Sequence, residues 1–174
     1  MQSTESMCAS CQAWRQVRYQ HFQRRNPPVT RPYPRGSVMS NTQRPAYTYR
    51  PMRSADVAAA HALSVQLKWP HRLEDWAMLQ RVSKGFVAED EGRLIGTAFT
   101  CPQGDYATIG LVIVSDEYQG QGIGRKLMEL ALQACGSQTA MLNATLAGAP
   151  LYVSQGFVDF GHIQQHQGNV LPPA

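Results

Sequence analysis

Long apolar runs are missing from this sequence. No stretch approaches the roughly 20 apolar residues that a membrane-spanning helix needs, and the first residues lack the apolar centre of a secretory signal. We therefore expect no membrane partner. The 174 residues, of which 43% are hydrophobic, suffice for one domain with a buried core.

Cysteine is also scarce, with four residues in the whole chain. Cys8 and Cys11 form a C-x-x-C pair, but a zinc site takes four ligands, and His21 is the nearest third candidate. Cys101 and Cys135 lie far apart in the sequence and are expected to be free thiols. The pattern predicts no metal site and a reducing, cytoplasmic setting.

Acidic residues are nearly absent from residues 1–38, which carry six arginines against one carboxylate, Glu5, and so a net charge of +5. The remaining 136 residues carry ten basic and eleven acidic side chains, a balance of −1. The formal charge of +4 therefore belongs to the amino-terminal segment and says nothing about a partner of the rest.

Residues 1–46 are rich in Arg, Gln, Pro and Ser, a composition that breaks helices and strands and offers little to bury. We expect this segment to be disordered. The aromatic residues among its arginines are Trp14, Tyr19, Phe22 and Tyr33. They could bind nucleic acid by charge and stacking, although this segment alone supports that role. The same composition would suit an organelle transit peptide, or an extension without function upstream of a start at Met39.

Regular periodicity begins at Tyr47, where alternating apolar residues predict strands and a 3.6-residue spacing predicts helices. Strands are expected at 47–50, as a hairpin within 85–100, and at 106–114, 139–143 and 157–165. Helices are expected after a cap at Ser54, from Leu73, from Gly122 to Ala134, and around Pro150–Ser154. The order β-α-α-β-β-β-α-β-α-β predicts one mixed α/β (α+β) domain over 47–168, followed by a short tail, 169–174.

The stretch YQGQGIGRK (118–126) connects a predicted strand to a predicted helix. Alternating glycines let a backbone approach a phosphate closely, and the N–H groups at a helix start point toward it. The spacing does not fit a Walker loop, G-x-x-x-x-G-K-[ST]. The dinucleotide pattern G-x-G-x-x-G also fails, because its third glycine would fall on Arg125.

Residues 119–124, QGQGIG, resemble the Q/R-x-x-G-x-G/A signature of the GNAT superfamily of acyl-CoA-dependent N-acetyltransferases. The segment ATLAGAPLYVSQGF (144–157) is similar to the closing part of that family, in which a short helix carries Leu-Tyr and ends in Gly-Phe. The resemblance spans about 47–166 and includes the order of elements. It implies the GNAT fold, a central twisted mixed sheet with helices on both faces.

Within that superfamily, WPHRLEDW (69–76) and NATLAGAPLYVSQGF (143–157) resemble an uncharacterised bacterial subgroup. Many members of this subgroup carry a further C-terminal domain. This chain ends at Ala174, so we expect acceptor contacts from such a domain to be missing.

The resemblance implies an acyltransferase (EC 2.3.1 type) that moves the acetyl group of acetyl-CoA directly to a primary amine of a small molecule. The residues expected to bind the coenzyme are Val112, Ile113, Val114, Gln119, Gly120, Gln121, Gly122, Ile123, Gly124 and Arg125. The backbone N–H of Val114 is expected to polarise the thioester carbonyl, and Tyr152 to act as the general acid. Relatives commonly splay the strand at 106–114 from the next one by a bulge, which Gly110 could mark.

The acceptor side is less defined. Candidate contacts are Trp69, His71, Arg72, Trp76 and Glu89, although both tryptophans would equally suit helix packing. For the general base the sequence offers Glu89, Asp105, His71, Glu74 and Asp75 without choosing among them. A polyamine, an amino acid, an aminoglycoside-like drug and a protein terminus all stay open as acceptors. The alternative function is a non-catalytic acyl-CoA sensor on the same fold, and a homodimer would match many relatives.

Overall fold

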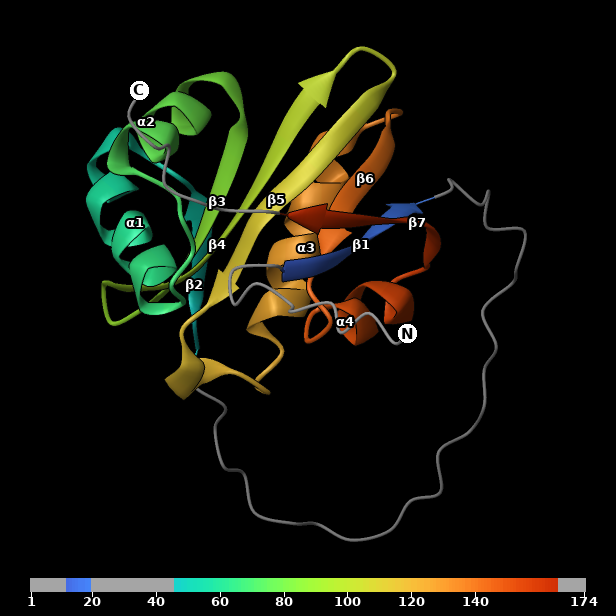
Figure 1. Ribbon diagram of the computed structural model, residues 1–174. Helices are drawn as coiled ribbons and strands as arrows, with labels where there is room; N and C mark the ends of the chain where they lie inside the picture. The colour runs from blue at the N-terminus through green and yellow to red at the C-terminus, as the bar shows by residue number, and fades with distance from the viewer. Residues whose placement is uncertain (1–11, 20–45, 166–174) are drawn as a thin grey trace, which may run out of the picture.

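The structure, a computed structural model, describes residues 12–19 and 46–165 (Figure 1). These residues form a seven-stranded sheet in the order β2-β3-β4-β5-β6-β1-β7. The strands are β1 (Gln12–Tyr19), β2 (Thr48–Pro51), β3 (Lys84–Asp90), β4 (Arg93–Gln103), β5 (Tyr106–Val114), β6 (Thr139–Ala144) and β7 (Phe157–Gln165). Neighbouring strands are antiparallel except β5 and β6, which are parallel.

Helices cover both faces of this sheet (Figure 1). The α-helices are α1 (Val57–Gln66), α2 (Leu73–Val82), α3 (Ile123–Cys135) and α4 (Ala149–Ser154), and the short 3-10 turns are η1 (Ser54–Asp56) and η2 (Asp116–Tyr118). Helices α1 and α2 pack over one face, while α3 and α4 pack over the other. None of the described helices is both long enough and apolar enough to cross a membrane.

Strands β3 and β4 have helices on both faces, and their side chains alternate between the two cores. Val87 packs with α1 and α2, whereas its neighbour Ala88 packs with α3 and α4, as the two-residue period of a strand requires. In β4 all six residues from 95 to 100 are buried. From β2 onward the order of strands and α-helices is β-α-α-β-β-β-α-β-α-β, so the predicted fold class is confirmed.

The amino-terminal segment holds a strand that the sequence did not predict. Strand β1 lies between β6 and β7 and pairs antiparallel with both, with Val17 opposite Leu142 and Trp14 opposite Ile163. The expectation of disorder over 1–46 is therefore wrong for residues 12–19. Composition misses this strand because two neighbouring strands supply its backbone partners, and that tertiary pairing leaves no local signal.

The other predictions for the termini fall outside the described residues. These include the C-x-x-C pair at Cys8 and Cys11 and the tail at 169–174. The five prolines of the amino-terminal segment, at positions 27, 28, 32, 34 and 45, also lie outside β1. Strand β1 therefore contains no proline, the residue type that lacks a backbone N–H for pairing with a neighbouring strand.

Candidate functional site

A β-bulge interrupts β5 and shapes the site. The register between β4 and β5 runs from Thr97 opposite Ile113 to Phe99 opposite Gly110, which leaves Leu111 and Val112 together opposite one residue of β4. Leu111 takes a positive φ of 48°, a conformation that is uncommon for a branched residue. The buried Thr97 Oγ1 donates a hydrogen bond of 2.7 Å to the Leu111 carbonyl, which stabilises the bulge.

At the bulge, the odd-numbered side chains of β5 change from one face of the sheet to the other. Ala107 and Ile109 pack in the core beneath α3 and α4, whereas Leu111 and Ile113 pack in the core beneath α1 and α2. In a regular strand all four side chains would share one face. One extra residue shifts the alternation and lets the same strand line both cores.

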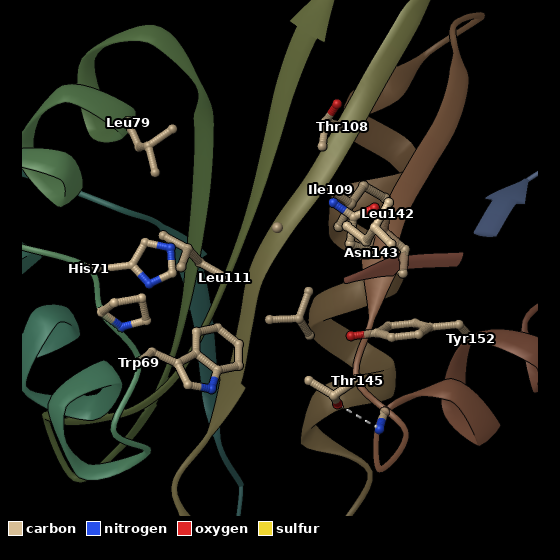
Figure 2. Close-up of a pocket in the computed structure, with 15 residues that line it drawn as sticks. Trp69, His71, Leu79, Thr108, Ile109, Leu111, Leu142, Asn143, Thr145 and Tyr152 are labelled. Atoms are coloured by element: carbon tan, nitrogen blue, oxygen red, sulfur yellow. Dashed lines mark hydrogen bonds between the residues drawn. The ribbon is translucent and has the colours of Figure 1, made fainter. Parts of the chain in front are cut away.

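Past the first residues of β5, the sheet opens. The parallel pairing of β5 with β6 runs from Tyr106 opposite Thr139 to Thr108 opposite Met141. Beyond Thr108 the two strands separate, as the bulge at this position leads us to expect. A cavity of about 570 Å³ lies at this fork (Figure 2). Its lining is Trp69, Pro70, His71, Leu79, Thr108, Ile109, Gly110, Leu111, Val112, Leu142, Asn143, Thr145, Gly148, Tyr152 and Ile163.

The glycine loop connects the end of β5 to the start of α3. Gly120 and Gly122 have φ of 75° and 85°, and Gly122 is the N-cap of α3. A Cβ atom built on either glycine would meet no other atom within 4 Å, so the space in front of both is open. The N–H of Lys126 donates to the carbonyl of Gly122, whereas the N–H groups of the preceding residues begin the helix without an intrahelical acceptor.

Gly124 has a different role from the two glycines before it. It lies in the first turn of α3, and a Cβ atom there would stand 3.4 Å from Leu151 and 3.6 Å from Val114. Its small size therefore serves the packing of α3 against α4 and β5. The signature thus combines two glycines in open, positive-φ positions with one glycine at a close contact.

Side-chain hydrogen bonds hold the loop in one conformation. Gln119 Nε2 donates to Asp116 Oδ1 at 2.8 Å, and the Tyr47 hydroxyl donates to Gln121 Oε1. The Tyr118 hydroxyl donates to Asp90 at 2.9 Å, which raises the pKa of that tyrosine. These bonds fix the backbone N–H groups before any ligand arrives.

Arg125 and Val114 lie at the edge of this site, and their predicted contacts with the coenzyme stay predictions. Arg125 is exposed, and its guanidinium donates to Ser154 Oγ at 2.9 Å, so its side chain runs toward the end of α4. Val114 is not among the residues that line the cavity, whereas Val112 is. Val112 belongs to the bulge, where β5 has no one-to-one partner on β4. The two bulge residues, Leu111 and Val112, therefore both line the cavity.

Tyr152 brings a hydroxyl into the cavity from α4 (Figure 2). Its side chain is 8% exposed and its ring packs edge-on against Phe157, with centroids 6.0 Å apart. Burial raises the pKa of this phenol to about 12. The turn before α4 is fixed by the Gly148 N–H, which donates to Thr145 Oγ1 at 3.0 Å. The phenol is therefore protonated at neutral pH and held in a fixed position.

Trp69 and His71 form the wall of the cavity on the side of α1 and α2 (Figure 2). Their ring centroids are 5.8 Å apart, and His61 hydrogen-bonds to the backbone carbonyl of His71 at 3.2 Å. The Nδ1 atom of His71 is buried and has no hydrogen-bond partner among the described residues. Burial lowers the pKa of His71 more than the nearby Asp75 raises it, so the ring is neutral at neutral pH.

The structure does not bring the other three acceptor candidates to the cavity. Trp76 is fully buried, packs edge-on against Phe99, and donates from Nε1 to Ser64 Oγ at 3.1 Å. Arg72 has a side chain that is 74% exposed and paired with Asp75 at the start of α2. Neither residue lines this cavity, because helical spacing does not distinguish a core or capping residue from one that lines a cavity, and their contacts with an acceptor stay predictions.

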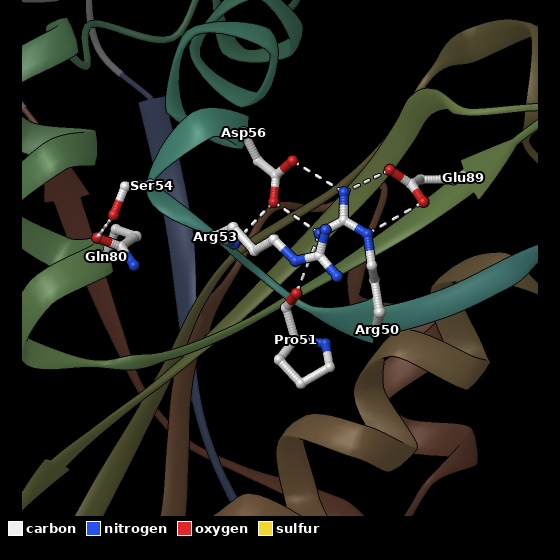
Figure 3. A network of polar contacts seen from close by, with 7 residues as sticks. All are labelled: Arg50, Pro51, Arg53, Ser54, Asp56, Gln80 and Glu89. Carbon is white, nitrogen blue, oxygen red and sulfur yellow. Dashed lines mark hydrogen bonds and ion pairs between the residues drawn. The ribbon is translucent and has the colours of Figure 1, made fainter.

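Glu89 belongs to a separate polar network (Figure 3). Arg50 lies between two carboxylates, donating to Glu89 and, at 2.7 Å, to Asp56. The hydrogen bonds to Arg50 lower the pKa of Asp56. Glu89 is absent from the cavity lining, and a substrate contact at Glu89 stays a prediction. The network fastens β2 to β3 and to η1.

Several cavity residues carried no recognisable signal in the sequence. Leu79, Thr108, Leu142, Asn143 and Ile163 line it from α2, β5, β6 and β7. Only Asn143 lies within one of the motifs, because NATLAGAPLYVSQGF begins with it. From the sequence alone, the remaining four are indistinguishable from residues that face the core of their helix or strand. Among the described residues there is no cluster of three or more His, Cys, Asp or Glu side chains that could hold a metal ion.

Comparison with known proteins agrees with this geometry. Residues 82–159 match the family model of the acetyltransferase (GNAT) domain. The uncharacterised N-acetyltransferase YitH of Bacillus subtilis is 37% identical over 71 residues, which are 40% of this chain and 25% of that protein. The matched part of the chain thus spans about a quarter of that relative's length.

Solved structures share the fold. The ribosomal-protein-S18-alanine N-acetyltransferase of Escherichia coli is 27% identical with a TM-score of 0.61, over 67% of this chain and 80% of that one. A GNAT-family protein of Novosphingobium aromaticivorans is 19% identical with a TM-score of 0.63, over 88% and 62%. An acetyltransferase of Clostridium acetobutylicum solved with acetyl-CoA is 17% identical with a TM-score of 0.54, over 66% and 92%. The family model, the curated relative and these folds together support membership of the chain in the GNAT superfamily of acetyltransferases.

Proposed function

We propose that this protein is an acetyl-CoA-dependent N-acetyltransferase that acts on a primary amine of a small molecule. The observation that carries the proposal is the fork between β5 and β6. It combines a cavity of about 570 Å³ that contains the Tyr152 hydroxyl with a bulge at Val112. The glycine loop begins just past the end of β5. Family membership supplies the class of reaction, and the cavity supplies room for a thioester and an acceptor.

The loop fits a pyrophosphate. The space in front of Gly120 and Gly122 is open, and the first N–H groups of α3 have no intrahelical acceptor. Such N–H groups, with the positive end of a helix dipole, bind phosphate oxygens. We assign the anchoring of the coenzyme to the backbone of residues 119–124. Arg125 donates a hydrogen bond to Ser154 of α4.

Acetyl-CoA, when bound, supplies an activated acetyl group as a thioester. In the proposed reaction the amine nitrogen bonds to the acetyl carbon, the carbon–sulfur bond breaks, and the proton lost by nitrogen ends on sulfur. A freed N–H in the bulge near Val112, instead of Val114, would donate to the carbonyl oxygen as negative charge develops there. One such donor contributes about 3 kcal/mol in other acyl transfers.

Tyr152 would stabilise the leaving sulfur. A phenol with a pKa of about 12 is a weaker acid than a thiol. It therefore keeps its proton and donates a hydrogen bond to the sulfur, while the amine provides the proton that the thiol finally carries. This role is narrower than the general-acid role expected from the sequence.

The test separates an enzyme from a non-catalytic acyl-CoA sensor. Thiol release from acetyl-CoA is followed with the full chain, in parallel for wild type and Tyr152→Phe, while acetyl-CoA affinity is measured on both. We expect the variant to bind acetyl-CoA within about twofold of wild type and to turn over at least tenfold more slowly. A wild type that binds acetyl-CoA but releases no thiol with any amine would favour the sensor.

A further inference from the structure

No charged side chain of the described residues lines the cavity. Its 15 lining residues, all within the described part of the chain, include no Lys, Arg, Asp or Glu. The two titratable groups among them are His71 and Tyr152. Burial lowers the pKa of the histidine and raises the pKa of the tyrosine to about 12, so both are neutral at neutral pH.

The surroundings of His71 keep it uncharged. Protonation would place a second N–H on its ring, and the buried Nδ1 has no acceptor among the described residues. The carboxylate that raises the pKa of His71 is Asp75, which is already paired with Arg72 at 3.0 Å. His61, on the neighbouring helix α1, contacts the backbone carbonyl of His71 rather than its ring. The wall therefore offers a cation no counter-charge.

An ordinary alkyl amine fits such a cavity poorly. Its ammonium form, like that of lysine with a pKa of about 10.4, predominates at neutral pH. Entry would strip water from a charge that no carboxylate compensates, which is costly. The amine must also lose a proton before its nitrogen can attack, and no ionised base is found among the described residues that line the cavity. Polyamines and aminoglycosides carry several such charges and fit worse still.

The lining suits a flat apolar group instead. The rings of Trp69 and His71 face the cavity, and their planes are inclined at 46° to each other. Leu79, Ile109 and Leu142 are among the other lining residues (Figure 2). Aromatic rings bind well against such surfaces by offset or edge contacts. We propose that the acceptor is a small aromatic amine whose nitrogen is attached to the ring and is therefore uncharged at neutral pH.

This inference rests on the proposed acetyltransferase function. A ring-bound amino group needs no base before it attacks the acetyl carbon. The nitrogen–carbon bond forms, the carbon–sulfur bond breaks, and one amine proton passes to sulfur, giving the amide and the free thiol. None of the carboxylates considered as the general base is among the lining residues.

Two isomeric probes test the inference. The compounds 4-ethylaniline and 2-phenylethylamine have the same atoms, but the first is neutral and the second is a cation at neutral pH. For the full chain we expect kcat/KM, from thiol release, to favour 4-ethylaniline at least tenfold. A preference for 2-phenylethylamine, for spermidine or for a peptide with a free N-terminal alanine would overturn the inference.

A variant reports on the charge directly. Asn143→Asp places a carboxylate at the cavity without changing side-chain size, and Asn143 is exposed enough to tolerate the change. We expect the ratio of kcat/KM values to move at least tenfold toward 2-phenylethylamine. Gln133→Glu adds the same charge on the exposed surface of α3 and should leave the ratio unchanged. An unchanged ratio in Asn143→Asp, or an equal change in both variants, would contradict the inference.

The melting temperature with and without acetyl-CoA distinguishes a failure of the proposed acetyltransferase function from a failure of the inference about the acceptor. If acetyl-CoA does not raise the melting temperature, the proposed function itself fails and the inference fails with it. If it does, and alkyl amines are the better acceptors, only the inference fails.

Discussion

Thr97 holds the carbonyl of Leu111 across the β-bulge, through a buried hydrogen bond of 2.7 Å. Leu111 is the residue whose positive φ turns β5 from one core to the other. The bond therefore secures the deviation that separates β5 from β6 and makes room for the cavity. A single hydroxyl on the neighbouring strand fixes the shape of the site.

Thr97→Val removes that hydroxyl while keeping the shape of the side chain. The Leu111 carbonyl would lose a buried partner, so we expect the free energy of unfolding to fall by about 1–3 kcal/mol and acetyl-CoA affinity to weaken. Urea unfolding and calorimetric titration would measure both. Thr100→Val is the matched control, because Thr100 is also fully buried but donates to the Ala131 carbonyl of α3. Equal loss of acetyl-CoA affinity in the two variants would contradict a special role of Thr97.

The buried phenol of Tyr152 predicts how stability depends on alkaline pH. Its pKa is about 12 in the folded protein, against about 10 when the chain is unfolded. Because the folded pKa is raised, the contribution of Tyr152 is complete below pH 10 and is lost as pH rises toward 12. Two pKa units correspond to about 3 kcal/mol. The difference in unfolding free energy between wild type and Tyr152→Phe should change by about that amount between pH 10 and pH 12. A difference that stays constant over this range would show that Tyr152 is not buried.

Deleting residues 1–19 should destabilise the fold, because β1 is the strand through which β7 joins the sheet. The facing edges of β6 and β7 would lose their backbone partners, and Ile163 of β7 would lose its support at the cavity wall. We expect a drop of several degrees in melting temperature and weaker acceptor binding. Deletion of residues 1–11 keeps β1 and is the control. Equal melting temperatures for the two deletions would contradict the pairing.

The sequence predicted the elements from β2 onward from local signals, which are a period in some elements and a cap or an apolar run in others. Helix α3 has a clear apolar face, and β5 alternates buried and less buried residues throughout. The bulge in β5 was expected near Gly110 from the resemblance to relatives, and no local pattern indicated it. Burial at positions 107, 109, 111 and 113 looks like one regular face, although the structure divides these residues between two cores.

The parts of the site that the sequence missed depend on long-range contacts. Trp69 and Trp76 are equally apolar, yet Trp69 lines the cavity and Trp76 fills the core. Strand β1 lies between β6 and β7, both far along the chain. Glu89 is predicted near the acceptor, but its partner Arg50 lies on β2. No local pattern encodes such pairings.

The most direct test of the coenzyme site is the melting temperature of the full chain with and without acetyl-CoA, compared for wild type, Gly122→Val and Gly104→Val. Both glycines have positive φ and open space where a Cβ atom would stand, but Gly104 lies in the turn between β4 and β5, away from the loop. Both variants should therefore suffer similar backbone strain.

Acetyl-CoA at about 100 times its dissociation constant should stabilise wild type by roughly 2.7 kcal/mol, a shift of several degrees. NADH and ATP should give no shift, Gly104→Val should keep the shift, and Gly122→Val should lose it. No shift in wild type, or the same shift in Gly122→Val, would contradict the assignment of the glycine loop as the coenzyme A site.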